Sequence, residues 1–304
     1  MNDFIKRCLI VASGLCAIGL VLVLIGGIFG GFRQTGFIAR RGGFSYPFYV
    51  NAAAFNGEDD EDSLSSESTG GFYENDNICA KEDVRELSLE VGACELEVIE
   101  WDGTVYKIAA RNVSDLKCFE QNGTLYVKSV RHHLKPAFKH SITLYVPKGA
   151  EFEYAELKLG AGKGIVKGLT AEEMTVEVGA GELTCRGLTV DTLRMEIGAG
   201  KAECRDCTVR DVHFEAGAGE LLYGGEINGD LDVSCALGNI ELSIAGNYQD
   251  YDYDIEAALG NVTIDQQGEG RISFSGISEK RVDNDAEKKM NLECAMGNVD
   301  ISFE

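Results

Sequence analysis

The chain has 304 residues, a formal net charge of −22 at pH 7, 37 glycines and three prolines. This excess of acidic side chains argues against a nucleic-acid partner, and against an anionic surface bound through bulk charge. The glycine content and an apolar fraction of 44% fit one elongated β domain with additional segments.

The first 41 residues differ from the rest in charge and hydrophobicity. Residues 8–32 are uncharged and mostly apolar, a run long enough to cross a bilayer as one helix and longer than the apolar core of a cleavable signal peptide. Residues 1–41 carry five basic side chains and one acidic side chain, so their net charge is +4 and that of the remainder is −26. We therefore predict a single-pass anchor in the cell membrane over residues 1–41. Basic residues lie on both sides of the run, so the positive-inside rule does not decide its orientation.

Residues 42–78 have the composition of a linker. They contain an aromatic patch, then an acidic run at residues 58–62, then a Ser/Gly-rich stretch. Low hydrophobicity and repeated like charge favour disorder. We predict an acidic flexible linker that separates the anchor from a domain over residues 79–304.

A glycine recurs every nineteen residues through the centre of that domain. The positions are Gly162, Gly181, Gly200, Gly219 and Gly238, and four of the copies read Gly-Ala-Gly. Apolar or small residues alternate with polar ones on both sides of each glycine, which is the period of a β-strand. The glycines are therefore expected at a corner between two short strands. Such a corner needs either a positive φ or close backbone approach.

A unit of this size cannot bury its own apolar face, so successive units must stack. We predict an all-β fold, a single-stranded parallel β-helix (β-solenoid) with rungs of about 19 residues. Like side chains would then stack about 4.8 Å apart, and eight or nine rungs would give a rod about 40 Å long. A series of antiparallel hairpins would explain the alternation, but not the constant spacing.

The repeat continues less regularly toward both ends. Ala258-Leu259-Gly260-Asn261 and Ala295-Met296-Gly297-Asn298 repeat the corner, so Gly260 and Gly297 complete the set of structural glycines. The 37 residues between these glycines are close to two turns. We therefore expect half a rung near Ile272, between these two corners, with residues 278–289 looping out. An early copy of the repeat lies at residues 89–94.

Residues 99–150 depart from the repeat. Three apolar stretches at residues 105–109, 125–127 and 142–146 have the pattern of strands, and Asn122-Gly123 favours a two-residue hairpin turn. We predict a hairpin region that caps one end of the solenoid, because an open strand edge invites pairing with another chain.

This part of the chain resembles a known family, the bacterial putative-adhesin domains of unknown function. The resemblance is carried by Trp101-Asp102-Gly103, by residues 122–127 and by residues 142–152 running into residues 157–162. It covers about residues 80–304. It implies a single-stranded β-helix, tethered by one helix and placed outside the membrane, as is common in Gram-positive envelope proteins. The family has no established reaction, so the resemblance implies no enzyme activity.

Candidate chemistry is sparse. Ten cysteines are present, and Cys185 and Cys204 share one apolar column of the repeat while Cys235 and Cys294 share another. Core packing is the preferred interpretation, and a disulfide between Cys185 and Cys204 is the alternative. Cys204 and Cys207 have C-x-x-C spacing but lack the second pair or the βαβ context that a zinc or redox site requires.

Histidines and aspartates offer two further candidates. His132, His133 and His140 belong to a basic loop, for which we expect solvation rather than metal binding. Asp250, Asp252 and Asp254 would share one face of an extended segment and are calcium candidates, although a charged bulge is the preferred interpretation. We predict no catalytic residue, no resident metal and no cofactor.

One surface column carries alternating charge. The residues that follow the repeat glycines are Lys163, Glu182, Lys201 and Glu220. Such exposed pairs would support the register of the rungs by about 0–1 kcal/mol each.

These expectations combine into a non-enzymatic, membrane-anchored cell-envelope protein, adhesin-like or sensory, with the solenoid outside the cytoplasm. Its partner would be a cell-wall polymer or another envelope protein. A carbohydrate-binding or carbohydrate-active β-helix is one alternative, with the segment around Tyr248 and Asp254 as its groove. A scaffold that faces the cytoplasm is another. The sequence does not predict an oligomeric state.

Overall fold

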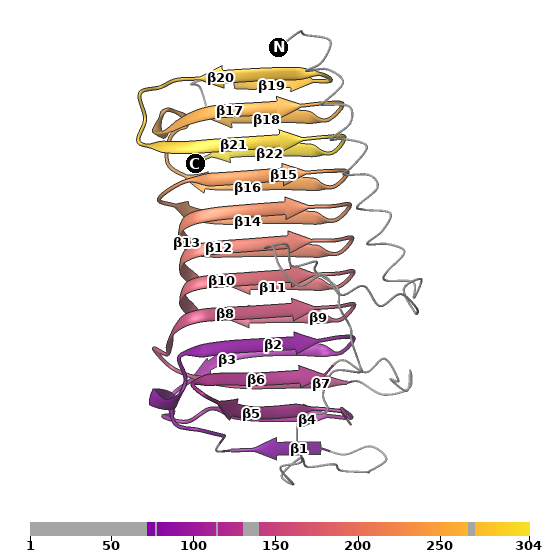
Figure 1. The fold of residues 1–304 in the computed structure, drawn as a ribbon, viewed down its shortest axis with the longest axis vertical. Helices are drawn as coiled ribbons and strands as arrows, with labels where there is room; N and C mark the ends of the chain where they lie inside the picture. The colour runs from indigo at the N-terminus through magenta and orange to yellow at the C-terminus, as the bar shows by residue number, and fades with distance from the viewer. Residues whose placement is uncertain (1–71, 77, 114, 130–139, 267–270) are drawn as a thin grey trace, which may run out of the picture.

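The computed structural model describes residues 72–76, 78–113, 115–129, 140–266 and 271–304 (Figure 1). The predicted anchor, most of the predicted linker, and His132 and His133 lie outside these ranges. Within them, no helix has the length and hydrophobicity needed to span a membrane.

The described chain is a stack of β rungs with two layers of strands, which confirms the all-β prediction (Figure 1). Layer 1 contains, in spatial order, β5 (Lys117–Gln121), β6 (Thr124–Ser129), β2 (Glu86–Val91), β8 (Glu151–Leu159), β10 (Thr170–Val178), β12 (Thr189–Ile197), the second half of β13 (Lys201–Ala216), β15 (Leu231–Cys235), β21 (Lys288–Cys294), β17 (Tyr251–Ala257) and β20 (Ser278–Val282). Layer 2 contains β1 (Phe72–Asn75), β4 (Lys107–Arg111), β7 (Ser141–Pro147), β3 (Glu95–Trp101), β9 (Lys163–Lys167), β11 (Glu182–Arg186), the first half of β13, β14 (Glu220–Ile227), β16 (Asn239–Ala245), β22 (Asn298–Phe303), β18 (Asn261–Gln266) and β19 (Arg271–Ser275). Two short 3-10 turns, η1 (Lys81–Asp83) and η2 (Tyr248–Asp250), complete the described elements.

The rungs in the centre of the stack follow one another in chain order. Glu151 pairs with Thr170, and Thr170 pairs with Thr189, always in parallel strands and nineteen positions apart. The predicted parallel rung is therefore confirmed here. Along β10, Met174, Val176 and Val178 are buried while Thr175 and Glu177 lie on the outside, so the period-two pattern of the sequence separates core from surface.

Two kinds of turn close each central rung, and they use glycine for different reasons. The corner after layer 1 contains the repeat glycines, none of which has a positive φ. The turn after layer 2 contains Gly168 and Gly187, with φ values of 67° and 63°, and Asp206 occupies the same place one rung on with φ 55°. Left-handed backbone is easily adopted by glycine and tolerated by aspartate. This second column also has a period of nineteen, and the sequence analysis missed it.

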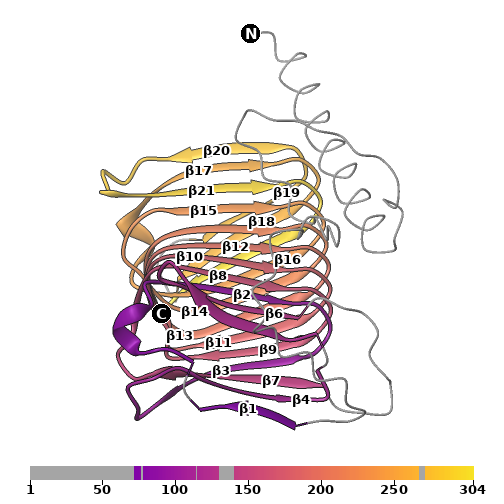
Figure 2. The ribbon, with the colours of Figure 1, turned by 60° about the horizontal axis from the view of Figure 1, so that its bottom comes forward.

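The N-terminal rung is inserted between two later rungs. Strands β2 and β3 pair with β6 and β7 on one side and with β8 and β9 on the other, always in parallel. Figure 2 shows β1, β4, β7 and β3 stacked in that order at this end. The predicted hairpin region therefore contributes one full parallel rung, β6 with β7. Beyond it, β5 pairs with β6, β4 with β7 and β1 with β4, all antiparallel, and these strands close the end.

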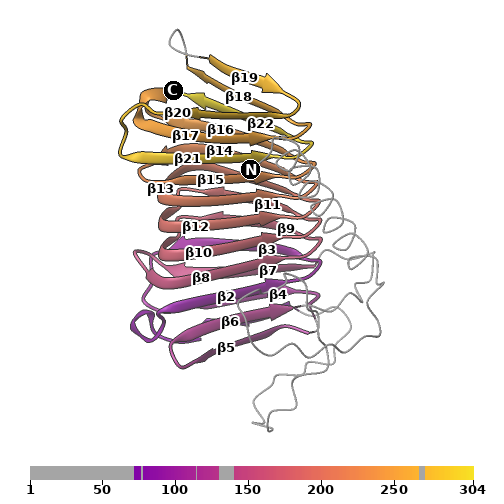
Figure 3. The same ribbon diagram turned by 45° about the horizontal axis from the view of Figure 1, so that its top comes forward.

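The C-terminal rung is inserted in the same way. Strands β21 and β22 lie between β15 and β16 on one side and β17 and β18 on the other (Figures 1 and 3). The expected sequential order, with half a rung near Ile272 between the corners at Gly260 and Gly297, is therefore wrong. Instead, the segment from β19 to β20 pairs antiparallel with β18 and β17 and closes this end. Strand β20 carries Glu279, Lys280 and Arg281, and such charges protect an open edge from further pairing.

One continuous core runs through the described part of the stack, from Val84 to Phe303. It is filled mainly by aliphatic side chains, with buried tyrosine, phenylalanine, cysteine and methionine side chains among them. Each fully buried aliphatic side chain stabilises the fold by about 1.5–3 kcal/mol. Because the strands pack on this core from both layers, the outer faces and the corners are left to carry function.

Candidate interaction surface along the corner of the solenoid

The corner that follows layer 1 stacks backbone on backbone. A Cβ atom at Gly181 would overlap the carbonyl oxygen of Gly162, and one at Gly200 would overlap that of Gly181. The same holds at Gly162, Gly219, Gly238 and Gly297 against the rung below, and at Gly260 against the Cys294 sulfur. Close approach, rather than a positive φ, is thus the reason for the repeat glycines.

The middle residue of each corner forms a backbone hydrogen bond with the corner of the neighbouring rung, and its side chain points outward. The amide of Ala199 donates to the carbonyl of Gly179 (2.8 Å), and that of Ala218 donates to Gly198 (2.7 Å). The side chains at this position form one outer line along the stack, which we call the corner ridge. Its members, in spatial order, are Ala161, Ala180, Ala199, Ala218, Leu237, Met296, Leu259 and Ile277.

The ridge changes character at the C-terminal end. The exposed fractions of Leu237, Met296, Leu259 and Ile277 are 41%, 36%, 66% and 54%, and we call these four residues the apolar row. Backbone hydrogen bonds from Met296 to Ala236 (2.8 Å) and from Leu259 to Ala295 (2.6 Å) place the first three on successive rungs. The bond from Gly276 to Gly260 (3.2 Å) places Ile277 beside Leu259.

Within the described ranges, the apolar row accounts for nearly all of the large apolar side chains left exposed. The other is Phe119, which stacks on Tyr126 with the ring centroids 5.0 Å apart. Exposed apolar side chains that gather on one line are more informative than scattered ones, because they mark sites of interaction.

The column beside the ridge changes at the same rung. In the centre it carries the predicted alternating charges, with Lys163 3.3 Å from Glu182 and Lys201 2.9 Å from Glu220. The hydrogen bond that Lys201 donates to the Glu220 carboxylate raises the pKa of Lys201. At the C-terminal end the column becomes Asn239, Asn298 and Asn261, whose amides replace the charges. The Nδ2 of Asn261 donates to the Oδ1 of Asn298 at 2.8 Å.

A shallow, open groove of about 540 Å³ lies between the ridge and this column. Its floor is formed by the stacked repeat glycines, which have no side chains to fill the space. One wall is made by ridge residues from Ala180 to Leu237, and the other by the charged and amide side chains. The groove therefore offers apolar contact on one side and polar contact on the other.

A second surface feature is a line of glutamates on the outer face of layer 1. Glu177, Glu196 and Glu215 are successive neighbours, and Lys158 lies 3.5 Å from Glu177. Burial, followed by the adjacent Glu215 carboxylate, raises the pKa of Glu196; burial also raises that of Glu177 against the opposing effect of Lys158. No group of three or more potential metal ligands occurs among the described residues, so this line is a stacked surface column.

The three aspartates considered as calcium ligands bind different partners. Asp250 accepts a hydrogen bond from the Asn247 amide (2.9 Å) and caps η2. Asp252 accepts from the amide of Asn284 (2.8 Å), and Asp254 pairs with Arg281 (3.0 Å). The structure thus uses each carboxylate locally and does not bring them together around one point.

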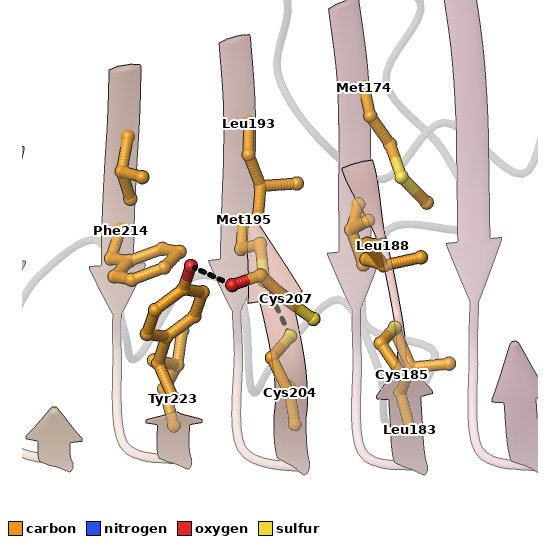
Figure 4. Packing of buried hydrophobic residues seen from close by; sticks show 14 of the residues in the cluster. Met174, Leu183, Cys185, Leu188, Leu193, Met195, Cys204, Cys207, Phe214 and Tyr223 are labelled. Atoms are coloured by element: carbon orange, nitrogen blue, oxygen red, sulfur yellow. Dashed lines mark hydrogen bonds between the residues drawn. The ribbon is translucent and has the colours of Figure 1, made fainter. Parts of the chain in front are cut away.

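The cysteines of the described residues are all free thiols, and most are buried. Cys185 and Cys204 are register neighbours, and the Cys204 sulfur lies 3.6 Å from that of Met195 (Figure 4). The Tyr223 hydroxyl donates to the Cys207 carbonyl (3.3 Å). Burial raises the pKa of Cys94 to about 12 and that of Cys79 to about 11. Thiols that stay protonated are poor nucleophiles and poor metal ligands.

Cys235 and Cys294 are also neighbours, for a reason the sequence does not show. The inserted strand β21 places Cys294 directly beside Cys235, although 58 residues separate them in the chain. Each thiol donates to the carbonyl of its own corner glycine, Cys235 to Gly238 (3.3 Å) and Cys294 to Gly297 (3.2 Å). Each sulfur also occupies the space that a side chain would fill at the corner glycine of the adjacent rung.

The apolar row is the feature that the sequence analysis missed. Its signal was present, because the middle corner residue changes from alanine to leucine or methionine where the next column changes from charge to asparagine. Recognising it required knowing that this position faces solvent, and that the corner at Gly297 lies between those at Gly238 and Gly260.

The chain was compared with known proteins. A family model described as Toastrack DUF4097 matches residues 84–302. No curated protein matches the chain. Several solved structures are similar to it.

One is described as a "putative cell adhesion protein" from Clostridium sporogenes ATCC 15579, with 11% identity, a TM-score of 0.35, and coverage of 78% of this chain and 100% of that one. Another is a "putative adhesin" from Bacteroides fragilis NCTC 9343, with 9% identity, a TM-score of 0.43, and coverage of 78% and 98%. A third is a "putative lipid binding protein" from Parabacteroides distasonis ATCC 8503, with 17% identity, a TM-score of 0.36, and coverage of 78% and 98%.

Proposed function

This chain belongs to the Toastrack DUF4097 family, and we propose that it is a non-enzymatic, membrane-anchored cell-envelope protein that presents the apolar row of its corner ridge as an adhesin-like binding surface. The observation that carries this proposal is the apolar row. Four large apolar side chains lie exposed on one line, and the adjacent column loses its charges over the same rungs. Two independent columns that change together indicate a surface adapted for contact.

The local environment of the candidate chemical groups favours binding over catalysis. A general acid or base needs a positioned carboxylate or imidazole that reaches a substrate. Asp250, Asp252 and Asp254 are each held by neighbouring backbone or by arginine. The thiols with raised pKa values are protonated at neutral pH.

Membrane attachment rests on residues 8–32, whose length and uncharged composition suit a bilayer-spanning helix. An extracytoplasmic body agrees with its net charge of −26, which keeps an exposed rod soluble. Most of the free cysteines of the described residues are buried, and buried thiols are unreactive, which is compatible with that location.

The orientation can be tested with a membrane-impermeant maleimide applied to intact cells. Ser65→Cys, in the predicted linker, supplies one accessible thiol in a variant whose native cysteines are replaced by serine or alanine. Labelling of intact cells is the expected result. Labelling only after lysis would place the body in the cytoplasm and would remove the adhesin-like proposal in favour of a cytoplasmic scaffold.

The binding role is tested by measuring how cells that carry the full chain attach to purified cell-wall sacculi and to sister cells. Leu259→Glu should reduce attachment at least tenfold, because it places a charge in the centre of the apolar row. Ala180→Glu, on the same ridge but among the charged rungs, is the matched control and should attach like the wild type. Equal attachment by wild type and by a strain lacking the protein would contradict the proposal.

A further inference from the structure

The apolar row lies at one end of the stack, and the described chain begins at the other. Strand β1 is at the bottom of Figure 1, while β15 to β22 are at the top. The 71 residues that precede β1, including the predicted anchor, therefore join the rod at the end remote from the apolar row. A partner of the apolar row is met at the tip of the rod.

We propose that the partner is a second copy of this chain, whose apolar row packs antiparallel against the first about a two-fold axis. This inference rests on the proposed function, because it names the partner of the same surface. In this arrangement Leu237 meets the partner's Ile277, and Met296 meets the partner's Leu259. Each pair occurs twice, once from each copy, as an isologous two-fold interface requires, and each contact is apolar on both sides.

The spacing of the row favours a second copy. Successive rungs are separated by about 4.8 Å in every solenoid of parallel strands, so two copies of the row match without drift along the four levels. A helix presents one apolar side chain per turn of about 5.4 Å and would fall out of step. An identical row matches all four side chains at once.

The distribution of charge supports the same partner. Beyond residue 41 the chain carries a net charge of −26, so two copies repel each other wherever their charged columns approach. On one side the apolar row is flanked by Asn239, Asn298 and Asn261, so the column next to the row adds no charge to this repulsion. An asparagine amide both donates and accepts hydrogen bonds, so the same amides can pair across the two-fold axis. Lys201 and Glu220 lie on rungs outside the overlap.

The antiparallel arrangement determines how two anchored rods are oriented. When two rods overlap at their tips, their β1 ends point away from each other. Two anchored copies would then link two facing membranes, which makes this a homophilic contact between neighbouring cells. Four side chains make a small interface, so a single contact is weak. Many copies on each surface raise the overall strength without new contacts.

The first test is sedimentation velocity of the detergent-solubilised full-length chain over a concentration series. We expect a concentration-dependent dimer whose population rises with salt, because salt screens the repulsion between acidic bodies. Leu259→Glu and Met296→Glu should each lower the association constant at least tenfold. Ala180→Glu should leave it unchanged, and matching thermal unfolding of all three variants would show that the fold is intact.

The second test uses the full chain in two populations of zwitterionic phosphatidylcholine vesicles that carry different fluorophores. Clustering of the two populations, lost with Leu259→Glu and kept with Ala180→Glu, is the expected result. A monomer at every concentration would overturn the inference. So would a dimer that Leu259→Glu does not affect, because it would use another surface, such as residues 8–32. Sacculus attachment that depends on Leu259 in a chain that stays monomeric would overturn the second copy as partner and leave the proposed function standing.

Discussion

The centre of the stack and its C-terminal end use the same corner with different residues. In the centre, from β8 to β14, the corner reads Gly-Ala-Gly, the next column alternates in charge, and the rungs follow chain order. At the C-terminal end, from β15 to β22, the corner reads Ala-Leu-Gly or Ala-Met-Gly, the next column is asparagine, and the last rung is inserted between two earlier ones.

The two regions share the corner residue that close backbone packing requires to be glycine. The third corner residue is glycine in both, because a Cβ there would overlap the rung below. The middle residue is exposed in both, so its change from alanine to leucine or methionine adds apolar surface that stays partly open to solvent. This difference is what supports the binding role proposed for the C-terminal end.

The largest effect is expected from adding a methyl group to a repeat glycine. Gly200→Ala places a Cβ against the backbone of Gly181, which cannot move without separating the rungs, and we expect a loss of about 3–5 kcal/mol in the free energy of unfolding. Gly187→Ala is the matched control. It has open space around the new methyl group and only a positive φ, so it should cost about 1–2 kcal/mol. Equal losses in urea unfolding would contradict the distinction between the two glycine columns.

The next effect tests the inserted strand. Leu292 in β21 is fully buried, and Leu292→Ala should cost about 2–5 kcal/mol. Strands β17 to β20 pair with the rest of the described stack only through β21 and β22, so their amides should exchange faster as one unit.

Leu193→Ala, in β12 at the centre of the stack, is the control for that measurement. It removes a buried leucine from the centre of the stack, and it should not loosen β17 to β20 selectively in hydrogen exchange. Selective loosening of these strands by Leu193→Ala would argue against the inserted order.

A smaller effect is expected from pH. Burial, together with Glu215, raises the pKa of Glu196 in the folded chain. Folding therefore disfavours the charged form of Glu196, which lowers the stability of the folded chain at neutral pH. This destabilisation disappears as the pH falls through the pKa of the folded state toward the pKa of the unfolded state. Glu196→Gln should melt above the wild type at pH 7, and the gap should close as the pH falls to about 4.5. A gap that widens on acidification would contradict this assignment.

The smallest effect concerns the alternating column. Glu182 lies beside Lys163 and is the register neighbour of Lys201, so Glu182→Lys replaces an attraction by repulsion between three stacked cations. Exposed pairs of this kind contribute about 0–1 kcal/mol. The melting temperature should fall slightly at low salt and recover at high salt, whereas Asn239→Lys, with no stacked cation, should change little. An unchanged melting temperature for Glu182→Lys would remove any role of this column in register.

The sequence predicts the centre of the stack well because each rung there contacts its neighbours in the chain. The period of nineteen, the alternation around Val176 and the corner at Gly181 all follow from local pattern. The order of the terminal rungs depends on which strand fills a gap between two others, and Leu292 has the same alternation whether its neighbour is Val233 or Ile255. The juxtaposition of Cys235 with Cys294, and that of Leu237 with Met296, could not be predicted for the same reason.

We propose that the apolar row is covered when the protein associates, and Met296 reports on this directly. It is exposed in the middle of the row, whereas Met174, Met195 and Met290 are buried, so mild peroxide should oxidise Met296 first. The measurement is the rate at which Met296 becomes the sulfoxide in the full-length chain at dilute and at associating concentrations, followed by mass spectrometry with the buried methionines as internal reference. We predict that association slows Met296 oxidation several-fold and leaves the other three rates unchanged. An unchanged Met296 rate in a sample shown to be associated would contradict the claim.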